Sequence, residues 1–157
     1  MQNMGLSIVA LSQGVPFYHA GSDMLRSKSF DRDSYDSGDW FNALDFTYQD
    51  NNWGKGLPVA SKNQDNWEIM RPLLGDPDLA VTQEDIMKSV VHLQEMLKIR
   101  KSSVLFRLRT AEDVMDRVAF HNTGPDQIPG LIVMSISDTG DLDDLDPNHA
   151  LVVVLFN

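Results

Sequence analysis

The sequence contains no cysteine among its 157 residues. Disulfide bonds, thiolate metal ligands and a cysteine nucleophile are therefore excluded. Basic residues are also scarce, because 13 Lys and Arg stand against 23 Asp and Glu, which gives a formal net charge of −10. Nucleic acids and anionic membranes attract basic surfaces, so we expect neither as a partner of this acidic chain.

Long apolar runs are missing as well. No stretch approaches the roughly 20 apolar residues that span a bilayer, and residues 1–15 lack the basic start and the cleavage pattern of a signal peptide. The composition is nevertheless sufficient for a hydrophobic core, since 42% of the residues are hydrophobic and 23% are charged. The sequence thus predicts a folded, acidic chain of ordinary domain size.

Motifs for metal binding are weak. The four histidines are scattered, with no pair at i, i+4, so no zinc site is expected. The acidic run at residues 138–146 lacks the glycine and the glutamate of an EF-hand loop, and we expect a solvated loop there. We therefore predict no metal site and no cofactor within this chain.

The chain begins with a helical pattern that is followed by a strand-like one. Met4, Ile8 and Leu11 share one helical face, and Gly14 follows where a glycine would end that helix. Residues 15–20 are short, aromatic and bounded by glycines. This second pattern predicts a buried strand.

A long irregular stretch comes next. Between residues 21 and 79, Asp, Asn, Ser, Gly and Trp dominate, and only residues 67–71 predict a short helix, with Asn66 as its cap. So long an irregular stretch is rare in a compact domain and is usually functional when it is ordered.

The clearest helix is predicted from Thr82 onward. Thr82 is a good N-cap, and Asp85 occupies the acidic position of a capping box. Basic residues favour the end of this helix near residue 101. Apolar residues at helical spacing form one stripe: Ile86, Val90, Leu93 and Leu97.

After residue 103 the pattern changes to short strands. A second capping signature at Thr110 predicts about one helical turn. Strand-like segments follow at residues 115–121, 131–136 and 150–156. The turn-rich residues between the first two segments predict a hairpin. The chain stops inside the third apolar segment, which leads us to expect a truncated piece.

Residues 21–45 hold the richest set of polar and aromatic side chains, including six aspartates. Carboxylates accept hydrogen bonds from vicinal hydroxyls, arginine donates to them, and aromatic rings cover the apolar face of a sugar. The pattern therefore fits a site for a neutral polyol. In the alternative interpretation, the same side chains cap turns and pair among themselves to hold the loop. No catalytic carboxylate pair can be chosen from their spacing.

The run RSKSFDRDSYDSGDWFN at residues 26–42 closely resembles pullulanase-type α-1,6-glucosidases, debranching enzymes of the α-amylase superfamily that include plant limit dextrinases. The resemblance begins at LSQGVPFYHAGSDMLRSKS (residues 11–29) and continues through DNNWGKGLP (residues 50–58). It returns at LKIRKSS (residues 97–103) and at FHNTGPDQ (residues 120–127). It thus covers essentially the whole chain in order.

The resemblance implies an α/β part followed by an all-β part. Residues 1–103 would form the last strand, the long eighth loop and the closing helix of a (β/α)8 barrel, and residues 104–157 would begin a C-terminal antiparallel β-sandwich. A full barrel needs about 250 residues. In the family the nucleophile, the general acid and the stabilising Asp come from the fourth, fifth and seventh strands, upstream of Met1. We therefore expect no catalytic residue here, and no hydrolysis by this chain alone.

The resemblance also implies a function. The parent enzyme would hydrolyse α-1,6-glucosidic bonds in pullulan, starch or glycogen limit dextrins, with retention through a glycosyl-enzyme intermediate. The substrate-binding residues that it implies are Arg26, Asp31, Asp33, Tyr35 and Trp40. The partners would be the α-glucan and the upstream barrel residues of the same parent protein. The alternative is a non-catalytic glucan-binding fragment or an inert accessory fragment.

Two further properties follow only from the resemblance. It leaves room for calcium in the full-length enzyme, and a calcium-stabilised structural module is a weaker alternative. It implies a secreted or periplasmic location if the parent is bacterial, although this chain carries no signal for it.

Overall fold

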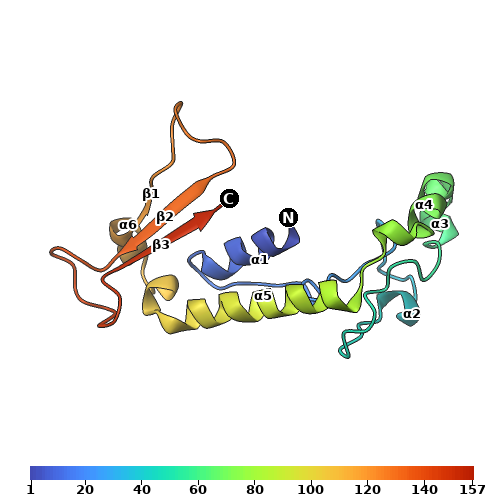
Figure 1. Cartoon of the computed structure of the whole chain (residues 1–157), viewed down its shortest axis with the longest axis horizontal. Helices are drawn as coiled ribbons and strands as arrows, with labels where there is room; N and C mark the ends of the chain where they lie inside the picture. The colour runs from blue at the N-terminus through green and yellow to red at the C-terminus, as the bar shows by residue number, and fades with distance from the viewer. The chain divides into compact units, whose positions relative to one another are not determined.

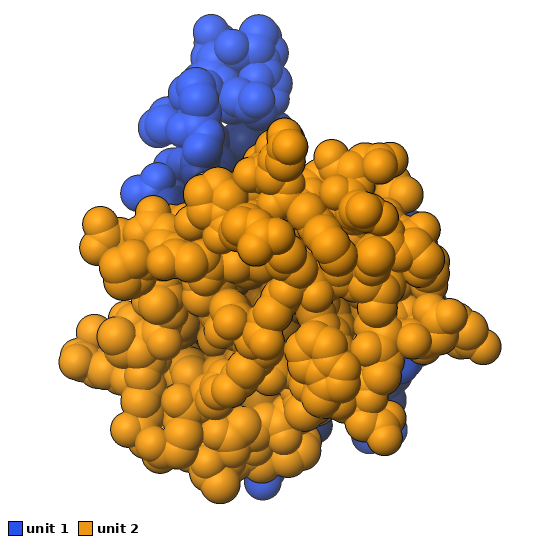
Figure 2. All heavy atoms as spheres, turned by 90° about the vertical axis from the view of Figure 1, so that its right-hand side faces the viewer, with its two compact units in different colours: residues 1–17, 92–157 blue, residues 18–91 orange.

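The computed structural model describes all 157 residues, and they divide into two compact units. Unit 1 combines residues 1–17 with residues 92–157, and unit 2 comprises residues 18–91 (Figure 2). Figure 1 shows the helices and strands in chain order. None of the helices combines the length and the apolar character that a membrane span requires.

Unit 1 begins with helix α1 (Gln2–Leu11). Leu6 and Ala10 are buried on this helix together with Leu11, whereas Met4 is exposed. The apolar face is therefore rotated from the predicted one. The helix also ends before the predicted Gly14, because Ser12 already has an extended ψ of 160°.

The buried side chain of Arg100 satisfies the carbonyl groups at the end of α1. Its Nη1 atom donates to the carbonyl oxygens of Ala10 at 2.8 Å and of Ser12 at 2.7 Å. Its Nη2 atom donates to the carbonyl oxygen of Gly14 at 2.5 Å. The last carbonyls of a helix have no partner within the helix, so this guanidinium stabilises the end of α1 and the chain that leaves it.

The strand predicted at residues 15–20 is absent, because these residues adopt no regular secondary structure. The side chains of Val15 and Phe17 are 77% and 85% exposed. A buried parallel strand needs hydrogen-bonded neighbours on both sides, and the single sheet of the structure contains only strands between residues 118 and 156. The prediction of a strand here is therefore wrong.

Helix α5 (Gln83–Ser102) is followed by the 3-10 helix η3 (Val104–Arg107) and by α6 (Ala111–Arg117). The hydroxyl of Thr110 accepts a hydrogen bond from the backbone N–H of Asp113 at 3.0 Å, which confirms the predicted cap. The capped helix extends beyond the single predicted turn. Residues 115–117 are consequently helical, and the strand predicted from residue 115 begins only at Val118.

Three antiparallel strands form the sheet of unit 1 in the order β1-β2-β3 (Figure 1). They are β1 (Val118–Phe120), β2 (Ile132–Ser137) and β3 (Leu151–Phe156). The predicted hairpin and third strand are thus confirmed. One face of the sheet buries Met134, Ile136, Val154 and Phe156. The structure contains one sheet, which is less than the two that make a β-sandwich.

A buried ion pair closes the acidic run at residues 138–146. The side chains of Arg117 and Asp138 are 3% and 1% exposed and contact each other directly. Asp138 also accepts hydrogen bonds from the backbone N–H groups of Leu145 at 2.9 Å and Asp146 at 2.7 Å. The prediction of a solvated loop is therefore wrong at both ends of the run, where Asp138 and Asp146 are buried.

The start of α5 belongs to unit 2 and has the predicted capping box. Asp85 N–H donates to Thr82 Oγ1 at 3.2 Å, and Thr82 N–H donates to Asp85 Oδ2 at 3.1 Å. Ile86 and Val90 then pack with Met24 in a buried cluster. The predicted stripe is confirmed at its first three positions, whereas Leu97 is exposed.

The rest of unit 2 contains only short helical elements. They are α2 (Asp39–Asn42), α3 (Ala60–Asn63), η1 (Gln64–Asn66), α4 (Trp67–Leu74) and η2 (Pro77–Leu79). Helix α4 confirms the helix predicted at residues 67–71, although the side chain of Asn66 makes no capping hydrogen bond. The long irregular stretch is therefore ordered without regular strands.

Candidate functional site

The richest cluster of polar and aromatic residues lies in residues 21–59, here called the polar loop. Hydrogen bonds hold its first and last parts side by side. Ser27 N–H donates to the carbonyl of Asn51 at 2.6 Å, and the Asn51 side-chain amide donates to the carbonyl of Leu25 at 2.9 Å. The hydroxyl of Ser29 donates to the carbonyl of Asn52 at 3.0 Å. Hydrogen bonds of side chains and of isolated backbone groups, without a strand ladder, therefore join residues 25–29 to residues 51–52.

Asn42 is a hub within the polar loop. Its carbonyl accepts from Arg26 Nη2 at 2.7 Å, and its Oδ1 atom accepts from Lys28 Nζ at 2.8 Å. Its Nδ2 group donates to the carbonyl of Ser34 at 3.1 Å. Burial, and then the positive charge of Arg26, lower the pKa of Lys28. Asn42 therefore positions two cations of the loop, Arg26 chiefly through its backbone carbonyl and Lys28 through its side chain.

Gly21 allows Arg26 to reach that position. Its φ of +92° is one that side chains rarely permit. An added Cβ atom would also lie 2.7 Å from Arg26 Cβ and 2.8 Å from a methyl group of Leu44. Only glycine fits at this start of the polar loop.

Asp31 accepts hydrogen bonds from three sides. Its Oδ1 atom accepts from the backbone N–H of Asp33 at 3.1 Å and from Asn63 Nδ2 at 2.8 Å, and its Oδ2 atom accepts from the hydroxyl of Ser37 at 2.6 Å. Desolvation raises the pKa of Asp31, but the hydrogen bonds from Ser37, Asp33 and Asn63 outweigh it and leave the pKa below its ordinary value. The carboxylate therefore stays ionised.

Lys62 of α3 reaches the polar loop and binds two of its carboxylates. Its Nζ atom lies 3.2 Å from Asp33 Oδ2 and 2.5 Å from Asp36 Oδ1. The hydrogen bond with Asp36 raises the pKa of Lys62 and lowers the pKa of Asp36. Lys62 and Asn63 were missed by sequence reasoning, because they lie 26 to 32 positions from their partners and no local pattern links them.

The two aromatic residues predicted to bind substrate are exposed. Tyr35 is 94% exposed and Trp40 is 55% exposed. Trp40 is supported by an edge-to-face contact with the buried Phe41, at 5.2 Å between ring centroids. Both rings can therefore present a face to a ligand.

The structure places the five predicted residues in one unit with two different roles. Arg26, Asp31 and Asp33 are engaged in bonds that hold the polar loop, whereas Tyr35 and Trp40 point apolar surface outward. Their contact with a glucan stays a prediction. The alternative role, in which polar side chains pair among themselves, describes the first three.

The backbone of the polar loop is strained. Five residues other than glycine have a positive φ, and all of them lie in this loop: Leu25, Ser29, Phe30, Tyr48 and Asn52. Such a conformation costs about 1–3 kcal/mol for each residue. Phe30 also makes an edge-to-face contact with Trp53 at 5.2 Å, and such a pair contributes about 0.5–1.5 kcal/mol.

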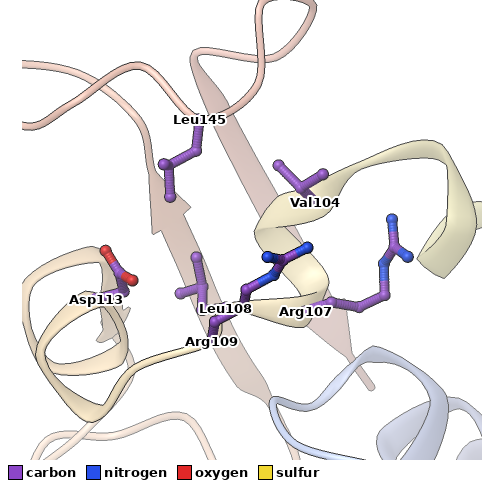
Figure 3. A pocket seen from close by; sticks show the side chains of 6 residues that line it. All are labelled: Val104, Arg107, Leu108, Arg109, Asp113 and Leu145. Carbon is purple, nitrogen blue, oxygen red and sulfur yellow. The ribbon is translucent and has the colours of Figure 1, made fainter.

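Unit 1 has a separate pocket of about 280 Å³. Figure 3 shows its lining residues, which are Val104, Arg107, Leu108, Arg109, Asp113 and Leu145. Both arginines are exposed, whereas the carboxylate of Asp113 already accepts a hydrogen bond from the hydroxyl of Thr110 at 2.7 Å. The pocket is therefore basic and partly apolar, which suits an anionic group better than a neutral glucan.

No group of three or more His, Asp or Glu side chains is arranged to hold a metal ion. The carboxylates of the polar loop are instead bonded to Lys62, to hydroxyls and to backbone N–H groups. These carboxylates are therefore already engaged in ion pairs and hydrogen bonds within the loop.

Comparisons with known proteins agree with one another. Residues 48–157 match the family described as "Alpha-1,6-glucosidases, pullulanase-type, C-terminal". All of this chain aligns with Pullulanase 1, chloroplastic, of Arabidopsis thaliana at 51% identity, and covers 17% of that protein. Pullulanase of Klebsiella pneumoniae is 45% identical over 88% of this chain, which covers 13% of that protein.

Solved structures give the same result. The maltotriose complex of PulA from Klebsiella pneumoniae matches with a TM-score of 0.87 and 42% identity, over 98% of this chain and 17% of that one. The chain spans 17% or less of the length of these relatives. Because the family match includes more than half of its residues, the chain belongs to the pullulanase-type α-1,6-glucosidases and carries part of their C-terminal region.

Proposed function

We propose that this chain is part of a glycoside hydrolase that cleaves α-1,6-glucosidic bonds in pullulan, starch or glycogen limit dextrins. The observation that carries the proposal is the 51% identity with a pullulanase across the whole chain, polar loop included. The similarity to a pullulanase that was solved with maltotriose supports an α-glucan as the ligand class.

The proposed reaction retains the anomeric configuration and needs a nucleophile and a general acid about 5 Å apart. A general acid needs a raised pKa, whereas the pKa values of Asp31 and Asp36 are lowered by their hydrogen bonds. These carboxylates are ionised acceptors and are unsuited to protonate a leaving group. The proposal therefore places the catalytic carboxylates outside this chain, which alone is inactive.

In the proposed enzyme, residues 1–103 complete a (β/α)8 barrel and residues 104–157 begin a C-terminal β-sandwich. The polar loop would then lie at the face where barrel enzymes keep their active sites. The high exposure of Val15 and Phe17 supports this arrangement, because these apolar side chains, which belong to no strand in this chain, would gain stability when the rest of a barrel covers them.

The five predicted contact residues have different roles in the proposed glucan binding. Tyr35 and Trp40 offer ring faces to glucosyl units, and Asp33 keeps a half-exposed carboxylate beside them in the sequence. Arg26 and Asp31 act chiefly by fixing the conformation of the loop. The proposal assigns no cofactor to this chain and leaves calcium to the full-length enzyme.

A chimera tests the proposal. The aligned segment of the Arabidopsis pullulanase is replaced by this chain, and the release of reducing ends from pullulan is measured. We expect the chimera to hydrolyse pullulan and the 157-residue chain alone to release nothing. A chimera that folds but is inactive, beside an active parent, would contradict the proposal.

The exposed rings of Tyr35 and Trp40 also fit the second candidate, a non-catalytic glucan-binding fragment. This candidate predicts that the chain alone is retarded during electrophoresis in a gel that contains pullulan. An inactive chimera together with retardation of the chain would favour it.

A further inference from the structure

Phe30 is an exposed aromatic residue in a backbone conformation that aromatic residues avoid. Its φ is +66°, and the preceding Ser29 has a φ of +46°. In this region the Cβ atom of an L-residue crowds the neighbouring carbonyl, and bulky side chains make the crowding worse. The ring is nevertheless 43% exposed.

The surrounding loop imposes this conformation. Ser29 N–H donates to the hydroxyl of Ser27 at 3.0 Å, and the buried hydroxyl of Ser29 donates to the carbonyl of Asn52 at 3.0 Å. On the other side, Asp31 N–H donates to the carbonyl of Lys28 at 2.8 Å. These bonds fix the residues before and after Phe30, and the direction of its ring follows from them.

A comparison with Tyr48 shows what is unusual. Tyr48 also has a positive φ, of +61°, but it packs against the buried cluster of Met24, Ile86 and Val90. Burial of apolar surface offsets the strain there. Phe30 has an edge-to-face contact with Trp53, at 5.2 Å and 75° between the rings, and much of its apolar surface still faces solvent. The fold thus holds an apolar ring in place without burying it.

Residues in rare conformations persist where the surrounding structure imposes them, and they concentrate at active sites and ligand clamps. A flat ring fixed at its edge by another aromatic residue can cover the apolar face of a sugar. We propose that Phe30, supported by Trp53, is a stacking residue for a glucosyl ring of the α-glucan. This inference rests on the proposed function and adds a binding position to the five residues named above.

The kinetic test uses the active chimera with Phe30→Ala and Phe30→Gly. Both variants remove the ring, so we expect the KM for pullulan to rise about three- to tenfold in each, while kcat changes little. The matched control is Phe46→Ala, since Phe46 is an exposed phenylalanine of the same loop with an ordinary φ. We expect its KM to equal that of the unmodified chimera.

The stability test separates strain from binding. Glycine adopts a positive φ freely and alanine does not, so Phe30→Gly should unfold about 2 °C above Phe30→Ala. At position 46 the order should reverse, because glycine there only adds freedom to the unfolded chain. A residue that merely supports the loop would show a loss of stability without the rise in KM.

The outcomes distinguish this inference from the proposed function. An active chimera whose two Phe30 variants keep the original KM overturns the stacking role and leaves the function standing. A chimera that folds but is inactive overturns the function and this inference with it. If the chimera does not fold, electrophoresis of the chain in a gel that contains pullulan decides. Stronger retardation of the unmodified chain than of Phe30→Ala supports stacking, and equal mobility overturns it.

Discussion

Unit 1 and the polar loop of unit 2 hold their shapes by different means. In unit 1 the side chains of α1, η3 and the sheet form an apolar core, and the buried Arg100 and Arg117 each bind several acceptors. In unit 2 a small apolar cluster joins Met24 of the polar loop to Ile86 and Val90 of α5, while the other bonds that hold the polar loop are made mainly by amides, hydroxyls and carboxylates.

This difference in the stabilising interactions determines which region can expose side chains to a ligand. An apolar core fixes a fold by excluding water, and it leaves few side chains free to meet a ligand. A network of directional bonds can instead keep aromatic rings exposed, as it does for Tyr35 and Trp40. Each such bond has a net value of only about 0.5–1.5 kcal/mol. The polar loop is therefore specific in shape and modest in local stability.

The largest effect is expected in unit 1, from Asp138→Ala. This change leaves the buried guanidinium of Arg117 without its carboxylate and removes the acceptor of two backbone N–H groups. Removal of one partner of a buried ion pair costs about 3–5 kcal/mol. Urea unfolding of the chain should show a loss of that size.

Glu84→Ala is the control for that measurement, because the Glu84–Lys88 pair is exposed on α5. Loss of such a surface pair should change the free energy of unfolding far less than Asp138→Ala does, because solvent screens exposed charges. Equal effects of Asp138→Ala and Glu84→Ala would show that burial of the first pair contributes nothing.

An intermediate effect is expected in the polar loop from Asn42→Ala. The change leaves Arg26 and Lys28 without side-chain acceptors at this hub and frees the carbonyl of Ser34. These side chains are partly buried, and hydrogen bonds of this kind have a net value of about 0.5–1.5 kcal/mol each. Amide hydrogen exchange should become faster in residues 26–52, with little change in β2.

Asn148→Ala is the matched control for Asn42→Ala. Asn148 is exposed, and its backbone N–H group, not its side chain, donates a hydrogen bond to Asp146 Oδ1 at 3.0 Å. Surface substitutions of this kind stay within about 0.5 kcal/mol. Faster exchange throughout the chain in Asn42→Ala would contradict the view that the hub acts locally.

The sequence predicts those elements whose signals are local. The capping box of Thr82 and Asp85 begins α5, and short apolar segments in the last third of the chain form the antiparallel sheet. The strand predicted at residues 15–20 fails because a strand depends on neighbours that a local pattern cannot supply. The cap at Thr110 outweighs the β-like pattern that follows, so α6 continues to Arg117.

The candidate site was predictable as a segment but not as a geometry. Composition and resemblance indicated residues 21–45, and all five predicted contact residues lie in one unit. The roles of Lys62 and Asn63 were hidden, since each reaches a carboxylate about 30 positions away. The positive φ of Phe30 was hidden as well, because one of the hydrogen bonds that impose it, from Ser29 to Asn52, joins distant parts of the loop.

Trp40→Ala in the chimera should lower stability less than the changes above, and it should weaken substrate binding clearly. More than half of this side chain is exposed, so little packing is lost. Loss of a ring contact of about 1 kcal/mol would raise the KM for pullulan several-fold. Unchanged KM and kcat on pullulan would remove Trp40 from the proposed site.

Trp67→Ala is the contrasting variant. The indole N–H of Trp67 donates to the carbonyl of Pro58 at 2.9 Å, and the side chain is partly buried. We expect Trp67→Ala to lower the midpoint temperature of unfolding more than Trp40→Ala does. The two variants would then assign substrate binding to Trp40 and stabilisation of the fold to Trp67, within one unit.

The smallest effect that we expect is a loss of stability of the polar loop at acidic pH. The carboxyl groups of the polar loop with lowered pKa values are Asp31, Asp36, Asp45 and Asp50. Their folded pKa values lie below the unfolded value of about 3.9, so the unfolded state takes up protons first as the pH falls. The stabilisation is therefore fully present above about pH 5 and is lost as the pH falls below about 4, through the folded pKa values.

This loss should be larger in the polar loop than in the sheet, because the loop holds four carboxyl groups with lowered pKa values, whereas β2 and β3 contain no Asp or Glu and Asp146 with a lowered pKa lies between them. Amide exchange at pH 3, corrected for the intrinsic rate and compared with pH 6, should lose more protection in residues 26–52 than in these strands. Added salt should weaken the same contacts at neutral pH, since the pairs of Lys62 are partly exposed and therefore screened. Equal loss of protection in the loop and the strands would mean that the two regions unfold as one, and the contrast between an apolar core and a polar network would then carry no difference in stability.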